Sequence, residues 1–168
     1  MKFHSGNELT TADVKFTFDR LKQSQDFKAI FKPFSGINII DDYTFELVTS
    51  EPYPLLLNTA TYIFPFDSEF YSGQTEDGKD KSAILKHGNS FASENLSGTG
   101  PYTVTERKQG VRVEFERFDD YWDTESPGNV GKIVLTPIKE NNTRVSALLS
   151  GGVDFIAPVP PNDLERIR

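Results

Sequence analysis

The sequence predicts a mixed α/β fold, because segments with the period of a helix alternate with segments that have the period of a strand. Near the amino terminus, apolar residues recur at spacings of three and four, which is typical of an amphipathic helix. Further along, two pairs of segments alternate apolar and polar residues, as half-buried strands do. The 168 residues are 36% hydrophobic and include 14 Phe, 6 Tyr and 1 Trp, which is enough apolar surface for one or two globular domains.

The first expected element is a helix that begins after Thr10 and runs to about Lys22. Thr10 and Asp13 have the spacing of a capping box, in which each side chain bonds a free backbone amide of the other. The buried face of this helix is expected to consist of Val14, Phe18 and Leu21. Phe16 lies on another face and is left without a predicted packing partner.

A two-stranded hairpin is expected next, with strands at 35–40 and 43–50 and one buried face. The turn between them contains no Gly, so the register stays open. A short helix over 55–61 follows two prolines. From 66 to 95, Ser, Gly, Asp, Lys and Glu dominate the sequence, which predicts a connector or a mobile loop.

The second half is predicted to be rich in strands, and its first two strands form an antiparallel hairpin through Gln109 and Gly110. The expected strands occupy residues 102–108, 111–118, 132–137 and 153–156. A helix capped by Asn141 or Asn142 lies between the last two strands and ends at the glycine pair 151–152. A proline-rich turn then leads into a last helix.

Composition excludes several classes of function. The 18 basic and 25 acidic side chains give a net charge of −7, which argues against nonspecific binding of nucleic acid. The absence of Cys excludes a disulfide framework, thiolate catalysis and cysteine metal sites. Neither a membrane span nor a signal peptide is visible, and we expect the chain to begin inside a longer protein.

No metal or phosphate site is predicted. His4 and His87 are far apart and have no partners at a metal-ligand spacing. The glycine-rich stretch 97–101 resembles a phosphate loop only superficially, because no Lys follows it and a strand rather than a helix comes next. We interpret this stretch as a tight turn into the strand.

One acidic cluster and one series of aromatic residues each allow two interpretations. Asp119, Asp120 and Asp123 flank Trp122 and could form a sugar site of the glycosidase type, but turn-forming acids beside a core Trp are favoured. An aromatic series could line a ligand surface or a lobe interface, although core packing is favoured. The series comprises Tyr53, Tyr62, Phe64, Phe66, Phe70 and Tyr71.

A family resemblance emerges from motifs that occur in a fixed order along most of the chain. They are Lys2-Phe3-His4-Ser5-Gly6, residues 9–21, Asp42-Tyr43-Thr44-Phe45 with Pro52 and Pro54, Gly98-Thr99-Gly100-Pro101-Tyr102, Phe118-Asp119-Asp120-Tyr121-Trp122, and residues 142–154. In this order they resemble the extracytoplasmic solute-binding proteins of the peptide/nickel class (oligopeptide- and dipeptide-binding, family 5) of ABC importers. The chain departs from the family at Ser5, where relatives have Asp, at Phe118-Asp119, where an Asn-Pro start is usual, and over residues 67–95.

The resemblance implies a type II periplasmic-binding-protein fold, present here as a fragment without the N-terminal strands and the C-terminal lobe. Residues 1–88 would be part of the smaller accessory lobe, and residues 89–168 part of the main lobe leading to the hinge. Relatives suggest Phe16, Ile156, Ala157 and Pro158 as ligand-binding residues. The alternative is that Phe16 packs between helix and sheet and that the proline-rich segment only turns the chain. Asp154 is expected to be a turn or capping acid.

The implied function is solute capture for import by lobe closure, without catalysis, cofactor or metal. Peptides are the leading ligand class, with nickel chelates or sugars as alternatives, and the partner is an ABC permease in the periplasm or at the outer face of the cytoplasmic membrane. Apolar surface left by truncation could also support a dimer. The alternative function is the ligand-sensing domain of a cytoplasmic transcription regulator, which a helix-turn-helix preceding residue 1 would reveal. A glycoside-active enzyme that uses the acids at 119–123 is the third hypothesis.

Overall fold

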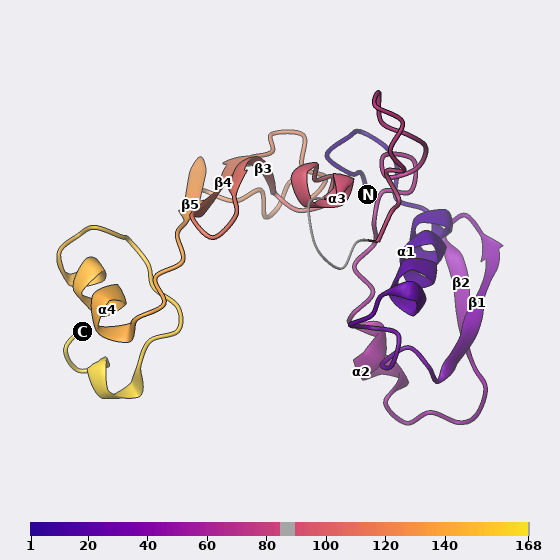
Figure 1. Ribbon diagram of the computed structural model, residues 1–168, viewed down its shortest axis with the longest axis horizontal. Helices are drawn as coiled ribbons and strands as arrows, with labels where there is room; N and C mark the ends of the chain where they lie inside the picture. The colour runs from indigo at the N-terminus through magenta and orange to yellow at the C-terminus, as the bar shows by residue number, and fades with distance from the viewer. Residues whose placement is uncertain (85–89, 168) are drawn as a thin grey trace.

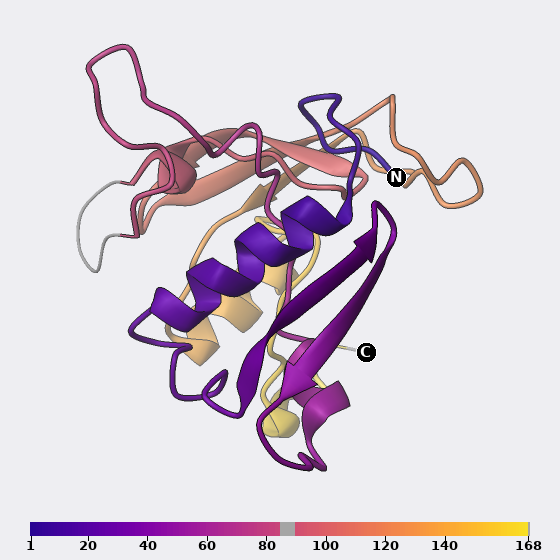
Figure 2. The ribbon, with the colours of Figure 1, turned by 90° about the vertical axis from the view of Figure 1, so that its right-hand side faces the viewer.

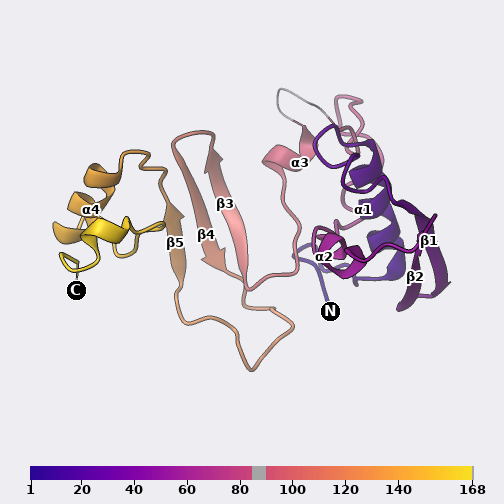
Figure 3. The same cartoon turned by 90° about the horizontal axis from the view of Figure 1, so that it is seen from below.

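The computed structural model describes residues 1–84 and 90–167, and its elements form three groups in a row (Figure 1). At one end, the helix–hairpin unit contains α1 (Thr11–Gln23), β1 (Phe34–Asp41), β2 (Thr44–Thr49) and α2 (Leu56–Ala60). The middle holds α3 (Phe91–Glu94) and the antiparallel sheet of β3 (Tyr102–Lys108), β4 (Arg112–Arg117) and β5 (Lys132–Leu135). At the other end lie α4 (Asn141–Leu149) and a 3₁₀ turn (Pro161–Asp163), as Figure 3 also shows.

The predicted start of α1 is confirmed. The Thr10 amide donates to Asp13 Oδ2 at 2.7 Å, and the capping box is complete. Val14 and Phe18 on the predicted face are buried, and Leu21 packs against the core cluster from the same side. Figure 2 shows α1 running alongside the β1–β2 hairpin, so the apolar stripe of the helix meets one face of the two strands.

The core of the helix–hairpin unit is a cluster of Phe18, Phe31 and Phe34. The Phe18 ring meets the other two edge-on, at centroid distances of 5.8 and 6.0 Å. The register that the sequence left open pairs Ile37 with Leu47, and both side chains pack against this cluster. The hairpin therefore covers the cluster from the side opposite α1.

The segment that begins at Phe66 differs from the expected connector or mobile loop. Asp67 and Tyr71 are buried, and the backbone here is fixed by side chains of α1. The Phe66 amide donates to Thr17 Oγ1 at 2.7 Å, and the Ser68 amide donates to the Asp13 carboxylate at 2.8 Å. The polar composition correctly suggests irregular backbone, but it does not reveal the acceptors that a distant helix supplies.

The predicted β3–β4 hairpin is confirmed, and β5 extends it on the side of β4. A bulge between Val104 and Glu106 shifts the pairing register of β3 with β4. After the bulge, Glu106 lies opposite Glu114 on β4. The latter carboxylate accepts from Arg112 Nε at 2.9 Å and from Lys132 Nζ at 2.6 Å. One face of the sheet therefore carries a network of paired charges.

Three expectations for the last part of the chain are wrong. Residues 153–156 form no strand, because the sheet ends at β5 and offers them no partner. The cap of α4 is neither Asn141 nor Asn142 but Glu140, whose carboxylate accepts from the Thr143 amide at 2.7 Å. The last helix is reduced to the 3₁₀ turn at Pro161–Asp163.

Candidate ligand-binding site

Phe16 lines an open hollow of about 360 Å³ between α1 and the segment before residue 85. The helix places Phe16 about half a turn away from the buried Phe18, which leaves its ring half-exposed. The rest of the lining is Asp19, Arg20, Gln23, Asp80, Ser82, Ala83 and Ile84. The hollow thus combines one aromatic wall with groups of both charges.

Arg20 is the central charge of this hollow. Its guanidinium lies 5.5 Å from the centroid of the Phe16 ring and 5.2 Å from that of Phe66, and Nη1 donates to the Ser82 carbonyl. Burial lowers the pKa of Arg20, and the nearby Asp80 carboxylate opposes that shift. Hydrogen bonds from the Ser82 hydroxyl and amide in turn lower the pKa of Asp80. The sequence gives no sign of this partnership, because 62 positions separate Arg20 from Ser82.

The other predicted site residues lie after α4. Ile156 is only 6% exposed, whereas Ala157 and Pro158 are exposed. Phe155, which sequence reasoning passed over, is 80% exposed and is the largest side chain that this segment presents. The Pro158 carbonyl accepts two hydrogen bonds from Arg144, at 3.2 Å from Nε and 2.9 Å from Nη2.

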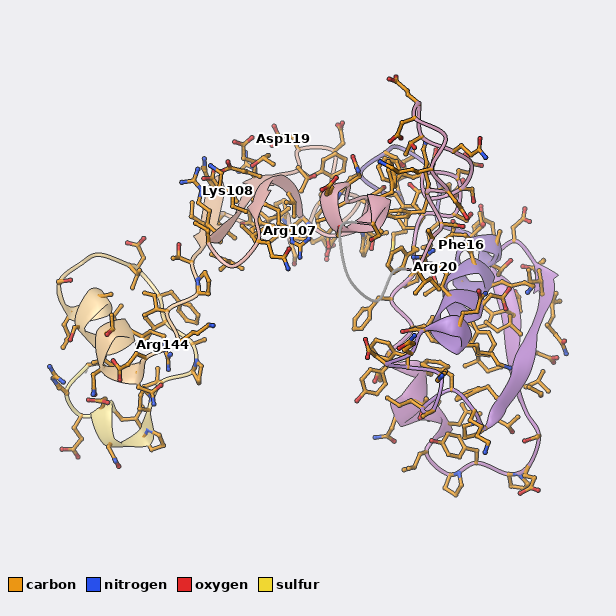
Figure 4. All side chains as sticks on the ribbon, in the orientation of Figure 1. Phe16, Arg20, Arg107, Lys108, Asp119 and Arg144 are labelled. Carbon is orange, nitrogen blue, oxygen red and sulfur yellow. The ribbon has the colours of Figure 1, made fainter. Side chains whose placement is uncertain are left out.

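The structure does not bring Phe16 together with residues 156–158. In Figure 4, Phe16 and Arg20 lie in the helix–hairpin unit, and Arg144, which contacts Pro158, lies at the opposite end of the molecule. The predicted residues therefore form two separate candidate contact points.

His4 and the glycine-rich turn, the candidates for a metal and a phosphate site in the sequence, contact each other in the fold. His4 Nδ1 accepts from the Gly98 amide at 3.2 Å, and Nε2 lies 2.9 Å from the Gly100 carbonyl, so this imidazole holds the glycine-rich turn. The turn is also bound by Trp122, whose Nε1 donates to the Thr99 carbonyl at 2.9 Å. His87 lies outside the described residues.

The acids around Trp122 behave as turn residues. Asp119 pairs with Arg117 at 3.2 Å, and Asp123 accepts from the Glu125 amide at 3.0 Å. Trp122 is 45% exposed, so the expectation of a core anchor is wrong at this position. Its indole stays near the surface because its N–H reaches the Thr99 carbonyl.

The aromatic series divides between the two interpretations. Tyr53 packs on the core cluster and Tyr71 is buried, as core packing predicts. Tyr62 and Phe64 are 45% and 71% exposed, so they remain on the surface at the end of α2.

Across residues 1–84 and 90–167, no helix is both long and apolar enough to span a membrane, and no group of three or more acids and histidines could hold a metal ion.

The whole chain, residues 1–168, matches the model of the bacterial extracellular solute-binding proteins, family 5 Middle. The chain belongs to this family. It is 26% identical over 168 residues to the glutathione-binding protein GsiB of Pectobacterium atrosepticum, an alignment that covers 95% of the chain and 29% of that protein. The GsiB protein of Salmonella typhimurium is 24% identical over 163 residues, again with 29% of the relative covered. This family 5 chain thus spans less than a third of the length of the curated relatives it matches.

Solved structures agree with the family match. NikA from Staphylococcus aureus, in complex with Ni(L-His)2, superposes with a TM-score of 0.74 at 26% identity, over 99% of this chain and 32% of that one. AppA from Bacillus subtilis, in complex with a nonapeptide, has a TM-score of 0.72 at 23% identity, with 99% and 32% covered. The resemblance to the peptide/nickel class is confirmed, and the mixed α/β architecture is that of part of a type II periplasmic binding protein.

Proposed function

We propose that this chain is part of the substrate-binding component of an ABC importer, which captures a solute outside the cytoplasm and delivers it to a permease. The match of residues 1–168 to the family carries the proposal. Capture would require no catalysis, because a ligand that binds the closed form better shifts two lobes toward closure. The protein would act in the periplasm or at the outer face of the cytoplasmic membrane.

The proposed division of the chain is residues 1–88 in the accessory lobe and residues 89–168 in the main lobe. The boundary itself falls outside the described residues. The separation of the helix–hairpin unit from the β3–β4–β5 sheet supports this division (Figure 3). Solute contacts on either side would then respond to closure.

Short peptides or amino-acid derivatives are the proposed solutes. Proteins similar to this chain are named for glutathione or hold Ni(L-His)2 or a nonapeptide, and all three solutes are amino-acid derivatives. The hollow at Phe16 offers an aromatic wall, the Arg20 guanidinium and the carboxylates of Asp19 and Asp80, which suits a solute that carries both charges. Ile156, Ala157 and Pro158 are the second proposed contact.

Calorimetric titration of the complete protein tests this function. The titrants are reduced glutathione, tri-alanine and Ni(II) with two equivalents of L-histidine. We expect at least one of them to bind with micromolar or tighter affinity and to release heat in a saturable, stoichiometric curve. Absence of binding by all three would count against the proposed solute class.

Two variants separate the proposed contact points. Phe16→Ala removes the aromatic wall, and Ala157→Glu adds a charge to an exposed position of the second segment. Each is expected to weaken binding about tenfold or more if its site touches the solute. The matched control is Ala29→Glu, at an exposed position outside both sites. A site whose variant binds as the control does is not a solute contact.

A permease and a second copy of the chain are the proposed protein partners. Large apolar side chains near α4 are exposed, among them Leu149, Phe155 and Leu164, and such surface favours association. Light scattering during size-exclusion chromatography gives the oligomeric state directly. A monomer at all concentrations would remove the dimer from the proposal.

A further inference from the structure

Arg144 is a buried cation with neutral partners. The residue is 8% exposed, and its guanidinium donates to the Ile138 carbonyl at 2.9 Å, to Asn141 Oδ1 at 2.7 Å and twice to the Pro158 carbonyl. A guanidinium stays charged in proteins, and burying a charge opposes folding unless a direct ion pair compensates it. The Glu140 carboxylate interacts electrostatically with Arg144 but makes no direct ion pair with it. An apolar side chain would fill this place at lower cost, so stability alone does not explain an arginine here.

The segment that Arg144 contacts has almost no hydrogen bonds of its own. Within the described residues, no backbone–backbone hydrogen bond involves the amides or carbonyls of residues 154–159. Pro158 and Pro160 have no amide hydrogen, so this stretch cannot build a regular ladder. The two bonds from Arg144 to Pro158 are therefore its polar attachment to the rest of the fold.

The same segment is also attached by one apolar side chain. Ile156 is buried, whereas Phe155, Ala157 and Pro158 are exposed. Ile156 inside and Arg144 at the Pro158 carbonyl thus fix the segment at two neighbouring points. A surface fixed in this way loses little conformational freedom when a solute settles on it.

We propose that Arg144 is a positioning residue, which holds residues 155–158 in the conformation that receives the solute. This inference rests on the proposed function, because it assumes that the segment is a solute contact. Arg144 itself would not touch the solute. Its planar fork matters because three donors reach two carbonyls, that of Ile138 before α4 in the chain and that of Pro158 after it, and a lysine ammonium cannot reproduce that geometry.

The test compares three variants of the complete protein. Arg144→Lys keeps the charge but cannot hold the Ile138 and Pro158 carbonyls together. Asn141→Ala removes the side chain that orients the guanidinium from α4 and leaves both bonds to Pro158 in place. Arg117→Lys is the matched control, at an exposed arginine on β4. Each variant is titrated with reduced glutathione, tri-alanine and Ni(II)–L-histidine, and backbone order parameters from nitrogen-15 relaxation and the melting temperature are recorded for each.

Arg144→Lys should weaken binding about tenfold and lower the backbone order parameters of residues 155–157 and 159, while those of α1 stay unchanged. Asn141→Ala should lower the melting temperature with little loss of affinity, and Arg117→Lys should change neither. Wild-type affinity in Arg144→Lys, or an equal loss of affinity in Asn141→Ala at the same melting temperature, would overturn the positioning role. Failure of the wild-type protein to bind all three titrants would instead overturn the proposed function, before any variant is compared.

Discussion

The Asp67 carboxylate is buried and accepts hydrogen bonds from three separate parts of the chain. The Ser5 and Ser97 hydroxyls donate to Oδ2 at 2.5 and 2.9 Å, and Nδ2 of the Asn7 side chain donates to Oδ1 at 2.9 Å. Burial alone would raise the pKa of this carboxyl, but these bonds and one from the Phe70 amide outweigh it, so the pKa lies below its ordinary value. Ionised Asp67 is therefore the form that the fold stabilises.

Asp67→Asn should lower the free energy of unfolding at pH 7 by about 1–3 kcal/mol, because the amide nitrogen faces donors and cannot accept from them. A carboxyl with a lowered pKa in the folded state stabilises above its unfolded pKa of about 3.9 and loses that contribution as pH falls through the folded value. The variant should lose less stability than the wild type between pH 5 and about pH 3. Urea unfolding at several pH values measures both effects. Asp26→Asn, at an exposed position, is the control, and an identical pH slope in wild type and Asp67→Asn would contradict the assignment.

At the level of elements, the spacing of apolar residues predicted the helix and the hairpins, whose formation depends on local sequence. The helix α1 and both hairpins carry their own pattern of apolar residues, and all were found close to their expected bounds. The prediction of a strand at 153–156 was wrong for a different reason: a strand needs a partner, and within residues 1–84 and 90–167 no strand pairs with β5 on its outer side. The prediction of an asparagine cap for α4 was wrong because the Glu140 carboxylate accepts from the Thr143 amide. The Asn141 side chain instead accepts a hydrogen bond from Arg144.

Gly128, in the loop between β4 and β5, is the glycine whose replacement should disturb the sheet. Its φ is +80°, and a Cβ there would lie 2.8 Å from the Tyr102 hydroxyl and 3.2 Å from Cζ of that ring. Gly128→Ala should therefore lower the free energy of unfolding by about 1–3 kcal/mol, through backbone strain and displacement of Tyr102 at the start of β3. Gly131→Ala is the matched control, because no heavy atom lies within 4 Å of its Cβ position. Urea unfolding of both variants gives the comparison, and equal stability would contradict the expected clash.

For the molecule as a whole, single candidate site residues could be predicted from the sequence, but the side chains that contact them could not. Phe16 and the segment 156–158 came from a family resemblance, which supplies positions and no contacts. The partners found around them, Arg20 with Ser82 and Arg144 with Pro158, join residues 62 and 14 positions apart. Such contacts depend on how distant segments pack, and no local periodicity encodes them.

The junction between the helix–hairpin unit and the sheet is built where residues 3–7, 66–71 and 95–101 meet. His4 contributes two hydrogen bonds to the glycine-rich turn, and its ring packs edge-on against Phe118 at 4.9 Å between centroids. The Ser97 hydroxyl joins the same turn to Asp67. These polar contacts link the part of the chain before residue 84 to the start of β3, so they should set the relative orientation of the two units (Figure 1).

His4→Phe combined with Ser97→Ala should loosen that orientation while each unit stays folded. Phenylalanine keeps the ring beside Phe118 but removes both bonds to the turn, and alanine removes the link to Asp67. Because the chain contains no cysteine, nitroxide labels at Ala12→Cys on α1 and Gln109→Cys in the β3–β4 turn report one distance between the units. Pulsed electron–electron double resonance should give a narrow distance distribution for the labelled chain without further substitutions and a clearly broader one for the double variant. Tyr43→Phe is the control, since it removes a 3.0 Å bond to Glu8 outside the junction. An unchanged distribution in the double variant would mean that the remaining contacts hold the two units in place, among them the 2.8 Å bond from the His4 backbone amide to the Gly98 carbonyl and the 3.0 Å bond from the Ser97 amide to the Tyr71 hydroxyl.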